Sequence, residues 1–172
     1  MSKVIFVCNV FEESTRLQRN IKSDSPAASK KVFDMALALK SVGIRSTILS
    51  MGRGAPNRNN SFFKSKVLFN EGIPIIYAPF SHNYLVTYLI SFFSMPYILS
   101  KLKSSNEKKT IIFYNRTSAY ISSLVLSTIL GFNRILDLED TELISYQKNI
   151  FYKFFLKLKK NIFNKLCSGG TI

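Results

Sequence analysis

The 172-residue sequence has few of the residues that build metal centres and disulfide frameworks. It contains one histidine (His82), two cysteines (Cys8 and Cys167) and no tryptophan. A multi-histidine metal centre, a four-cysteine zinc site and a disulfide framework are therefore excluded. We expect no metal and no bound cofactor.

Acidic residues are also scarce, with 10 Asp and Glu against 24 Lys and Arg, for a formal charge of +14. This surplus favours an anionic partner: a nucleic acid, a phosphorylated ligand or an anionic membrane. The basic residues are dispersed, lysine outnumbers arginine, and no nucleic-acid reading module is recognisable. We therefore expect no nucleic-acid partner.

The N-terminus lacks the pattern of a signal peptide, because its short apolar run ends at Glu12 and Glu13. We expect a cytoplasmic location, with the inner face of the cell membrane as an alternative. Residues 81–100 carry no charged side chain and are just long enough to span a bilayer. His82, Pro96 and several hydroxyl residues dilute this run, so a buried or membrane-surface helix is favoured over a spanning one.

Hydrophobic residues make up 47% of the chain, as in a folded protein, and short β-rich runs alternate with helical patterns. Ser25-Pro26 marks a helix start, and Gly43 a helix end. This alternation predicts an α/β fold: one Rossmann-like domain over residues 1–166 with a doubly wound parallel sheet. Residues 167–172 are expected to begin a strand that is cut short. Strands are predicted at 3–11, 44–51, 64–70 (short and peripheral), 73–78, 110–114 and 134–138. Helices are predicted at 26–42, 83–102, 118–130 and 141–166. A loop is predicted at 12–25.

Four stretches carry a resemblance to a known family: residues 3–11, the helix and strand of 25–54, IIFYNR at 111–116, and RILDLEDTE at 134–142. Together they resemble the N-terminal, acceptor-binding domain of a GT-B fold glycosyltransferase of retaining family four. The Gly-Gly of that family's first loop is replaced here by Ser25-Pro26-Ala27-Ala28-Ser29.

The resemblance implies the acceptor-binding half of a glycosyltransferase of hexosyltransferase type. Such an enzyme transfers a sugar, with retention, from a nucleotide-sugar to a cell-surface glycan or a lipid-linked precursor. The family's donor-binding domain, with its Glu-x₇-Glu signature, has no counterpart in the sequence. The chain alone is therefore expected to be inactive, and whether it is an enzyme by itself stays open. The alternative is a non-catalytic membrane-surface binding domain, or the remnant of a truncated gene.

In doubly wound sheets, ligands bind beyond the carboxyl ends of the strands. Glu139 and Asp140 follow the last predicted strand there and are the candidate catalytic pair, with Glu139 at the position of the family's histidine. Asp140 has the alternative role of a helix N-cap. The candidate substrate-binding residues at this edge are Asn9, Ser25, Ala27, Ser29, His82, Asn115 and Arg116.

Several of these residues also have a structural role as an alternative to ligand binding. Small residues before the first helix could offer N–H groups to phosphate, or simply cap the helix. Arg116 suits bidentate contact with an anion, or an ion pair with one of the acids at 137–140. His82, with no second histidine, favours a structural role.

The last predicted helix is basic and amphipathic, with one broad apolar side and six lysines between residues 148 and 165. Such a helix suits an anionic membrane surface or an ordinary core contact with a solvated lysine face. Lys153, Lys157 and Lys160 are the candidate membrane-surface residues.

Overall fold

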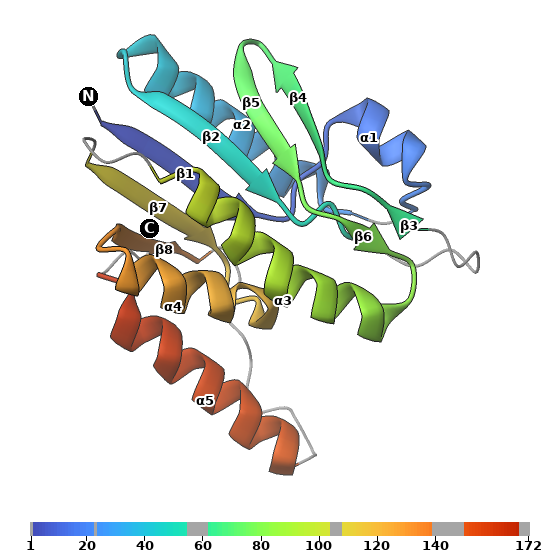
Figure 1. Ribbon diagram of the computed structural model, residues 1–172, viewed down its shortest axis with the longest axis vertical. Coiled ribbons are helices and arrows are strands. Elements are labelled where there is room, and N and C mark those ends of the chain that lie inside the picture. Colours follow the sequence, from blue (N-terminus) through green and yellow to red (C-terminus); the bar gives the residue numbers. More distant parts are fainter. Residues whose placement is uncertain (1, 23, 55–61, 104–107, 139–149, 169–172) are drawn as a thin grey trace.

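A six-stranded sheet forms the centre of the computed structural model, which describes residues 2–22, 24–54, 62–103, 108–138 and 150–168 (Figure 1). The strand order is β4-β5-β2-β1-β7-β8. The strands of this sheet are β1 (Lys3–Cys8), β2 (Arg45–Ser50), β4 (Lys66–Asn70), β5 (Ile73–Tyr77), β7 (Lys109–Tyr114) and β8 (Asn133–Asp137). The helices are α1 (Glu13–Gln18), α2 (Pro26–Ser41), α3 (Tyr84–Lys101), the 3₁₀ turn η1 (Ser118–Tyr120), α4 (Ile121–Ile129) and α5 (Ile150–Leu166).

All strand pairs in this sheet are parallel except β4 with β5. Counted along the chain, the parallel strands follow the order 3-2-1-4-5, which is compatible with a Rossmann-like domain. The predicted α/β class with helices on both faces of the sheet is confirmed. The antiparallel edge strand departs from an all-parallel sheet, because Glu71 and Gly72, with φ of 49° and 76°, form a tight hairpin turn between β4 and β5.

Strand β1 lies at the centre of the sheet and is apolar on both faces. Val4, Phe6 and Cys8 face one core cluster, and Ile5 and Val7 face the other. The strand ends at Cys8 rather than at Phe11, because the backbone beyond it bonds to side chains. The N–H of Val10 donates to Ser50 Oγ (3.0 Å).

Helix α2 covers one face of the sheet, which we call the α2 face. It begins as predicted: Ser25 caps it, its Oγ accepting from the N–H of Ala28 (3.3 Å), and Pro26 follows. It ends in a Schellman motif, in which the N–H of Ile44 bonds to the Leu39 carbonyl and Gly43 takes a φ of 76°.

Helix α1 occupies part of the segment predicted to be a loop, so that prediction is wrong at residues 13–18. The Glu12 side chain accepts hydrogen bonds from the N–H groups of Ser14 and Thr15 and caps this short helix. Thr15 is fully buried, which anchors the helix to the domain.

Helices α3, α4 and α5 cover the opposite face, which we call the α3–α5 face (Figure 1). Helix α3 agrees closely with its prediction, with Asn83 as N-cap and Leu102 as C-cap. Among the helices that the structure describes, none combines the length and the hydropathy that a membrane crossing requires. The predicted helix at 141–166 is described only from Ile150 onward, and the strand expected at 167–172 only as far as Ser168.

Candidate functional site

The loops after β1 and β7 and the start of α2 lie at the carboxyl edge of the sheet, and they contain all the predicted substrate-binding residues except His82. In this strand order, the crevice expected to bind a ligand opens between β1 and β7, where the connections diverge to opposite faces. Asn9 follows β1, Asn115 and Arg116 follow β7, and the start of α2 lies between β1 and β2 in the chain.

Asn9 uses its side chain to bind the loop after β2. Its Nδ2 donates to the Arg53 carbonyl (2.7 Å), and its Oδ1 accepts from the Arg53 N–H (2.8 Å). Ser50 reinforces this junction, because its Oγ accepts from the N–H of Gly52 and donates to the Val10 carbonyl (2.7 Å). Asn9 therefore shapes the edge by fixing two loops to each other.

The first turn of α2 contributes backbone groups rather than free hydroxyls. Ser25 Oγ caps Ala28, and the buried Ser29 Oγ accepts from the N–H of Phe11 (3.1 Å). Pro26 has no N–H, and Ala27 is exposed. Since an N–H in the first turn has no intrahelical acceptor, the Ala27 N–H is the group at this terminus best suited to a ligand oxygen.

Asp137, at the end of β8, is paired with a lysine from α2. The carboxylate is only 4% exposed, and Lys31 Nζ lies 3.1 Å from Oδ2 and 3.2 Å from Oδ1. The same ammonium lies 5.3 Å from the centre of the Tyr114 ring. The sequence analysis did not select Lys31; the pair links positions 106 residues apart, and only the strand order brings them together.

Asn115 and Arg116 form the turn after β7. Asn115 has a φ of 63°, and its N–H donates to the Asp137 carbonyl (2.8 Å). Arg116 Nη2 donates to Asn164 Oδ1 of α5 (3.0 Å), while its Nε is buried without a hydrogen-bond partner. Of the acids at 137–140 considered as partners of Arg116, Asp137 pairs with Lys31 instead, and Glu139 and Asp140 fall outside the described residues.

His82 lies in the interior, between β6 (Phe80–Ser81) and α3. Its Nε2 is 3.0 Å from the Arg19 carbonyl oxygen, and its ring makes edge contacts with Phe63 and Phe80. These two phenylalanines belong to β3 (Phe62–Phe63) and β6 (Phe80–Ser81), a short antiparallel pair that the sequence did not predict. These contacts give His82 a packing role.

Arg19 is the buried cation that sequence reasoning missed. Its side chain is 1% exposed, and its guanidinium donates to the carbonyls of Met51 (3.3 Å), Gly52 (2.8 Å) and Ala78 (2.9 Å). Burial lowers the pKa of Arg19 to about 10. Among the described residues no carboxylate pairs with it.

Aromatic rings and a glycine complete the Arg19 site. The guanidinium carbon lies 5.3 Å from the Tyr77 ring centre, and Phe63 and Phe80 are within 6 Å. A Cβ at Gly52 would lie 2.3 Å from Arg19 Nη1, and Gly52 has a φ of 56°. Arg19 thus connects the carboxyl ends of β2 and β5. In the sequence, only the glycine at position 52 hinted that a bulky group approaches the backbone there.

The remaining candidates are the predicted catalytic pair and the lysines of α5. Glu139 and Asp140, the predicted catalytic pair, fall outside the described residues. Lys157 and Lys160 are exposed on α5, and Lys153 is half-buried. Within the described part of the chain, no cluster of His, Cys, Asp and Glu suits a metal ion.

A cavity of about 350 Å³ opens at the other edge of the sheet, beside the amino ends of β1, β2 and β5. Lys3, Lys40 and Arg45 contribute cations to its wall, and no acidic residue lines it. Lys40 Nζ donates to the Glu71 carbonyl. This hollow is chemically suited to small anions, and no sequence pattern indicated it.

Comparison with models of known protein families, with curated proteins and with solved structures found no match. The functional interpretation therefore rests on the fold and on the residues at its edges.

Proposed function

We propose that this chain is the acceptor-binding domain of a glycosyltransferase that uses a nucleotide-sugar to extend a cell-surface glycan or a lipid-linked precursor. The observation that carries the proposal is the set of groups at the β1–β7 crevice. The Ala27 N–H and the Lys31 ammonium come from α2, which begins at this edge, and the Arg116 guanidinium comes from the turn after β7, which ends there.

These groups suit a phosphorylated or carboxylated sugar. Arg116 has a planar fork that suits bidentate contact with an anion, and binding would exchange the bond from its Nη2 to Asn164 of α5 for bonds to the ligand. The positive end of the α2 dipole adds attraction for negative charge, whereas the charge of Lys31 is offset by Asp137. Asn115, in a left-handed conformation, holds the turn that presents Arg116.

In this proposal the nucleotide-sugar binds mainly to a second domain, and Glu139 and Asp140 lie near the acceptor hydroxyl. The chain alone then binds the acceptor without transferring sugar. The sequence resemblance supports the proposed reaction class, and the strand order and the groups at this edge support the proposed location.

The test is an amide NMR titration of the protein with glucose 1-phosphate, with methyl glucoside and with UDP. We expect glucose 1-phosphate to shift the amides of Ala27, Asn115 and Arg116, and UDP to have a weaker effect. Arg116→Gln should weaken glucose 1-phosphate binding about tenfold, because it removes charge-assisted hydrogen bonds. Arg45→Gln, which removes the same charge at the amino edge, should leave the affinity unchanged.

Two results would overturn the proposal. One is the absence of shifts at the β1–β7 crevice with either sugar probe. The other is a response confined to the cavity beside Lys3, Lys40 and Arg45, which would move the anion site to the amino edge.

A further inference from the structure

Helix α3 turns several large apolar residues outward, while Met95 and Leu99 of the same helix are buried in the core. Thr87 and Ser91, on the side that packs on the domain, are each only 2% exposed. On the other side, Leu89 is 62% and Phe93 69% exposed. A helix that borders water normally has the reverse arrangement, with polar side chains outside. The outer side of α3 is therefore suited to an apolar neighbour.

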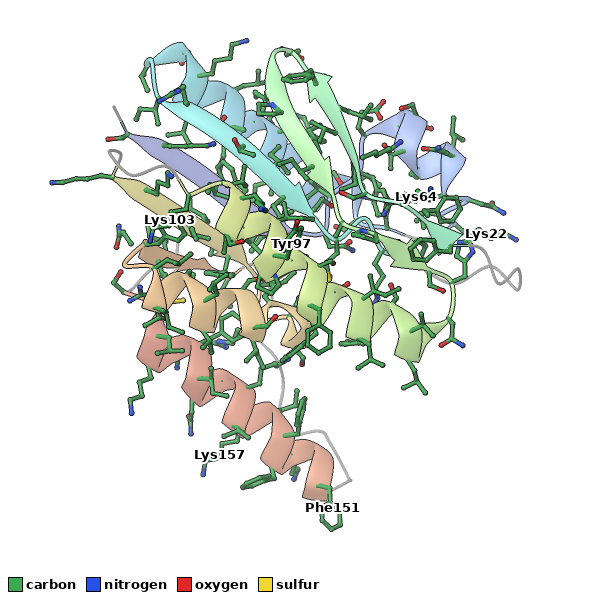
Figure 2. The ribbon with its side chains drawn as sticks, viewed as in Figure 1. Lys22, Lys64, Tyr97, Lys103, Phe151 and Lys157 are labelled. Atoms are coloured by element: carbon green, nitrogen blue, oxygen red, sulfur yellow. The ribbon has the colours of Figure 1, made fainter. Side chains whose placement is uncertain are left out.

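Helix α5 has a second exposed apolar side. Phe151 is 82% exposed and lies at the end of the helix that points away from the sheet (Figure 2). Phe154, Phe155 and Leu158 follow at helical spacing and are also exposed. The core contact of α5 uses a different side, with Leu156 and Phe163 buried.

These two sides belong to one helical layer. Helix α4 contacts both α3 and α5, and its own Ile129 is exposed. We call this layer's outward apolar set the outer apolar surface. It consists of Leu85, Leu89, Phe93 and Tyr97 of α3, Ile129 of α4, and Phe151, Phe154, Phe155 and Leu158 of α5.

The charges beside the outer apolar surface are all positive. Lys153, Lys157 and Lys160 share one side of α5, because they are spaced four and three residues apart. Lys157 points away from α4 in Figure 2. The ranges 84–101, 118–130 and 150–168 contain no Asp or Glu. Acidic residues are thus absent from this described layer, while lysines border it.

We propose that the outer apolar surface docks on the surface of an anionic lipid bilayer. Aromatic and aliphatic side chains of α3 and α5 enter the headgroup boundary, and the α5 lysines contact lipid phosphates. Charge complementarity selects this occupant, because a second copy of the chain would bring the same lysines together. The inference does not rest on the proposed sugar-transfer function.

The test is co-sedimentation of the protein with vesicles made of equal parts phosphatidylcholine and phosphatidylglycerol, compared with pure phosphatidylcholine. We expect binding to the anionic vesicles only, weakening as salt is raised. The double variant Lys157→Gln/Lys160→Gln should lower the partition coefficient on the order of thirtyfold. Each lysine near the membrane surface raises that coefficient by a factor of about five.

Two further variants separate charge from apolar contact. Lys22→Gln/Lys64→Gln removes the same charge from exposed positions remote from α5 and should change binding far less (Figure 2). Phe93→Ser/Phe151→Ser keeps all charges and should reduce binding at least tenfold. Circular dichroism of each variant checks that the fold is retained, as the exposure of these side chains predicts.

Three outcomes would overturn the inference. The first is equal binding to both kinds of vesicle, and the second is equal loss in the two lysine double variants. The third is a concentration-dependent dimer in sedimentation velocity without lipid that Phe93→Ser/Phe151→Ser dissociates, with no vesicle binding. That result would assign the surface to a second copy of the chain. None of these measurements involves sugar binding, so this inference can fail while the crevice proposal stands.

Discussion

On the α2 face of the sheet, the helices turn charged pairs toward solvent and small or apolar residues toward the core. Lys30 and Asp34 pair on α2 (2.5 Å), and Arg16 and Glu13 pair on α1 (2.6 Å). On the α3–α5 face, hydroxyl residues of α3 are buried, and its phenylalanines are exposed. The comparison shows that the helices of the α2 face present polar and charged side chains to water. The α3–α5 face, in contrast, exposes large apolar side chains that its own core does not use.

The largest effect should separate the inner and outer sides of α5. Phe163 is fully buried in the core of the α3–α5 face, so Phe163→Ala should lower the free energy of unfolding by about 4 kcal/mol. Phe151→Ala should change it by less than about 0.5 kcal/mol, because the ring is exposed. Urea denaturation measures both. Similar losses in the two variants would mean that Phe151 is part of the core.

The second effect concerns the junction of β2 and β5, where the polar contacts are buried. Arg19→Met should cost about 3 kcal/mol, because three backbone carbonyls lose their donor in a site without water access. Gly52→Ala should also destabilise, since its Cβ would overlap the Arg19 side chain. Thermal denaturation checks both, and a neutral Arg19→Met would show that the carbonyls find other donors.

The third effect concerns the pairing between α2 and β8. Lys31→Met should cost about 2 kcal/mol, because it leaves the buried Asp137 carboxylate without its cation. Adding Asp137→Asn should recover much of that loss, since the amide carries no charge. A double-mutant cycle in urea gives the coupling, and additive losses in the double variant would contradict the pairing.

Sequence reasoning succeeded where the end of an element has a local signature. Ser25-Pro26 and Asn83 mark the starts of α2 and α3, and Gly43 and Gly131 mark helix ends with positive φ. It failed at α1, whose cap is Glu12 rather than one of the usual N-cap residues, and whose six residues are too few to show a helical period.

The site was harder to predict than the fold, because its contacts join distant parts of the chain. Arg19 binds backbone carbonyls, which every residue has, so no particular residue type in the sequence indicates these contacts. Lys31 meets Asp137 only because the strand order brings α2 and β8 together. The exposed apolar side of α3 was not predicted either. Apolar residues occur around the whole helix, so the sequence did not reveal which side packs on the sheet.

The smallest effect is pH-dependent and concerns the cap of α1. Burial acts to raise the pKa of Glu12, but the hydrogen bonds from Ser14 and Thr15 outweigh it and hold that pKa below its ordinary value. A lowered pKa in the folded state stabilises the protein above the ordinary pKa of glutamate, and this stabilisation is lost as pH falls through the folded pKa. Glu12→Gln should therefore cost roughly 0.5 kcal/mol at pH 7 and less near pH 3. Urea denaturation at both pH values measures the difference, and a cost that does not vary with pH would contradict the role of the charge.

The contrast between the two faces is tested most directly by fluorescence, because the chain has no tryptophan of its own. Three single variants place the reporter at exposed positions: Phe93→Trp on α3, Phe151→Trp on α5, and Phe69→Trp on the edge strand β4. On adding vesicles of equal parts phosphatidylcholine and phosphatidylglycerol, we predict a blue shift at positions 93 and 151 and none at position 69. The same spectrum with and without vesicles at both helical positions, or an equal shift at all three, would contradict a lipid-facing α3–α5 layer.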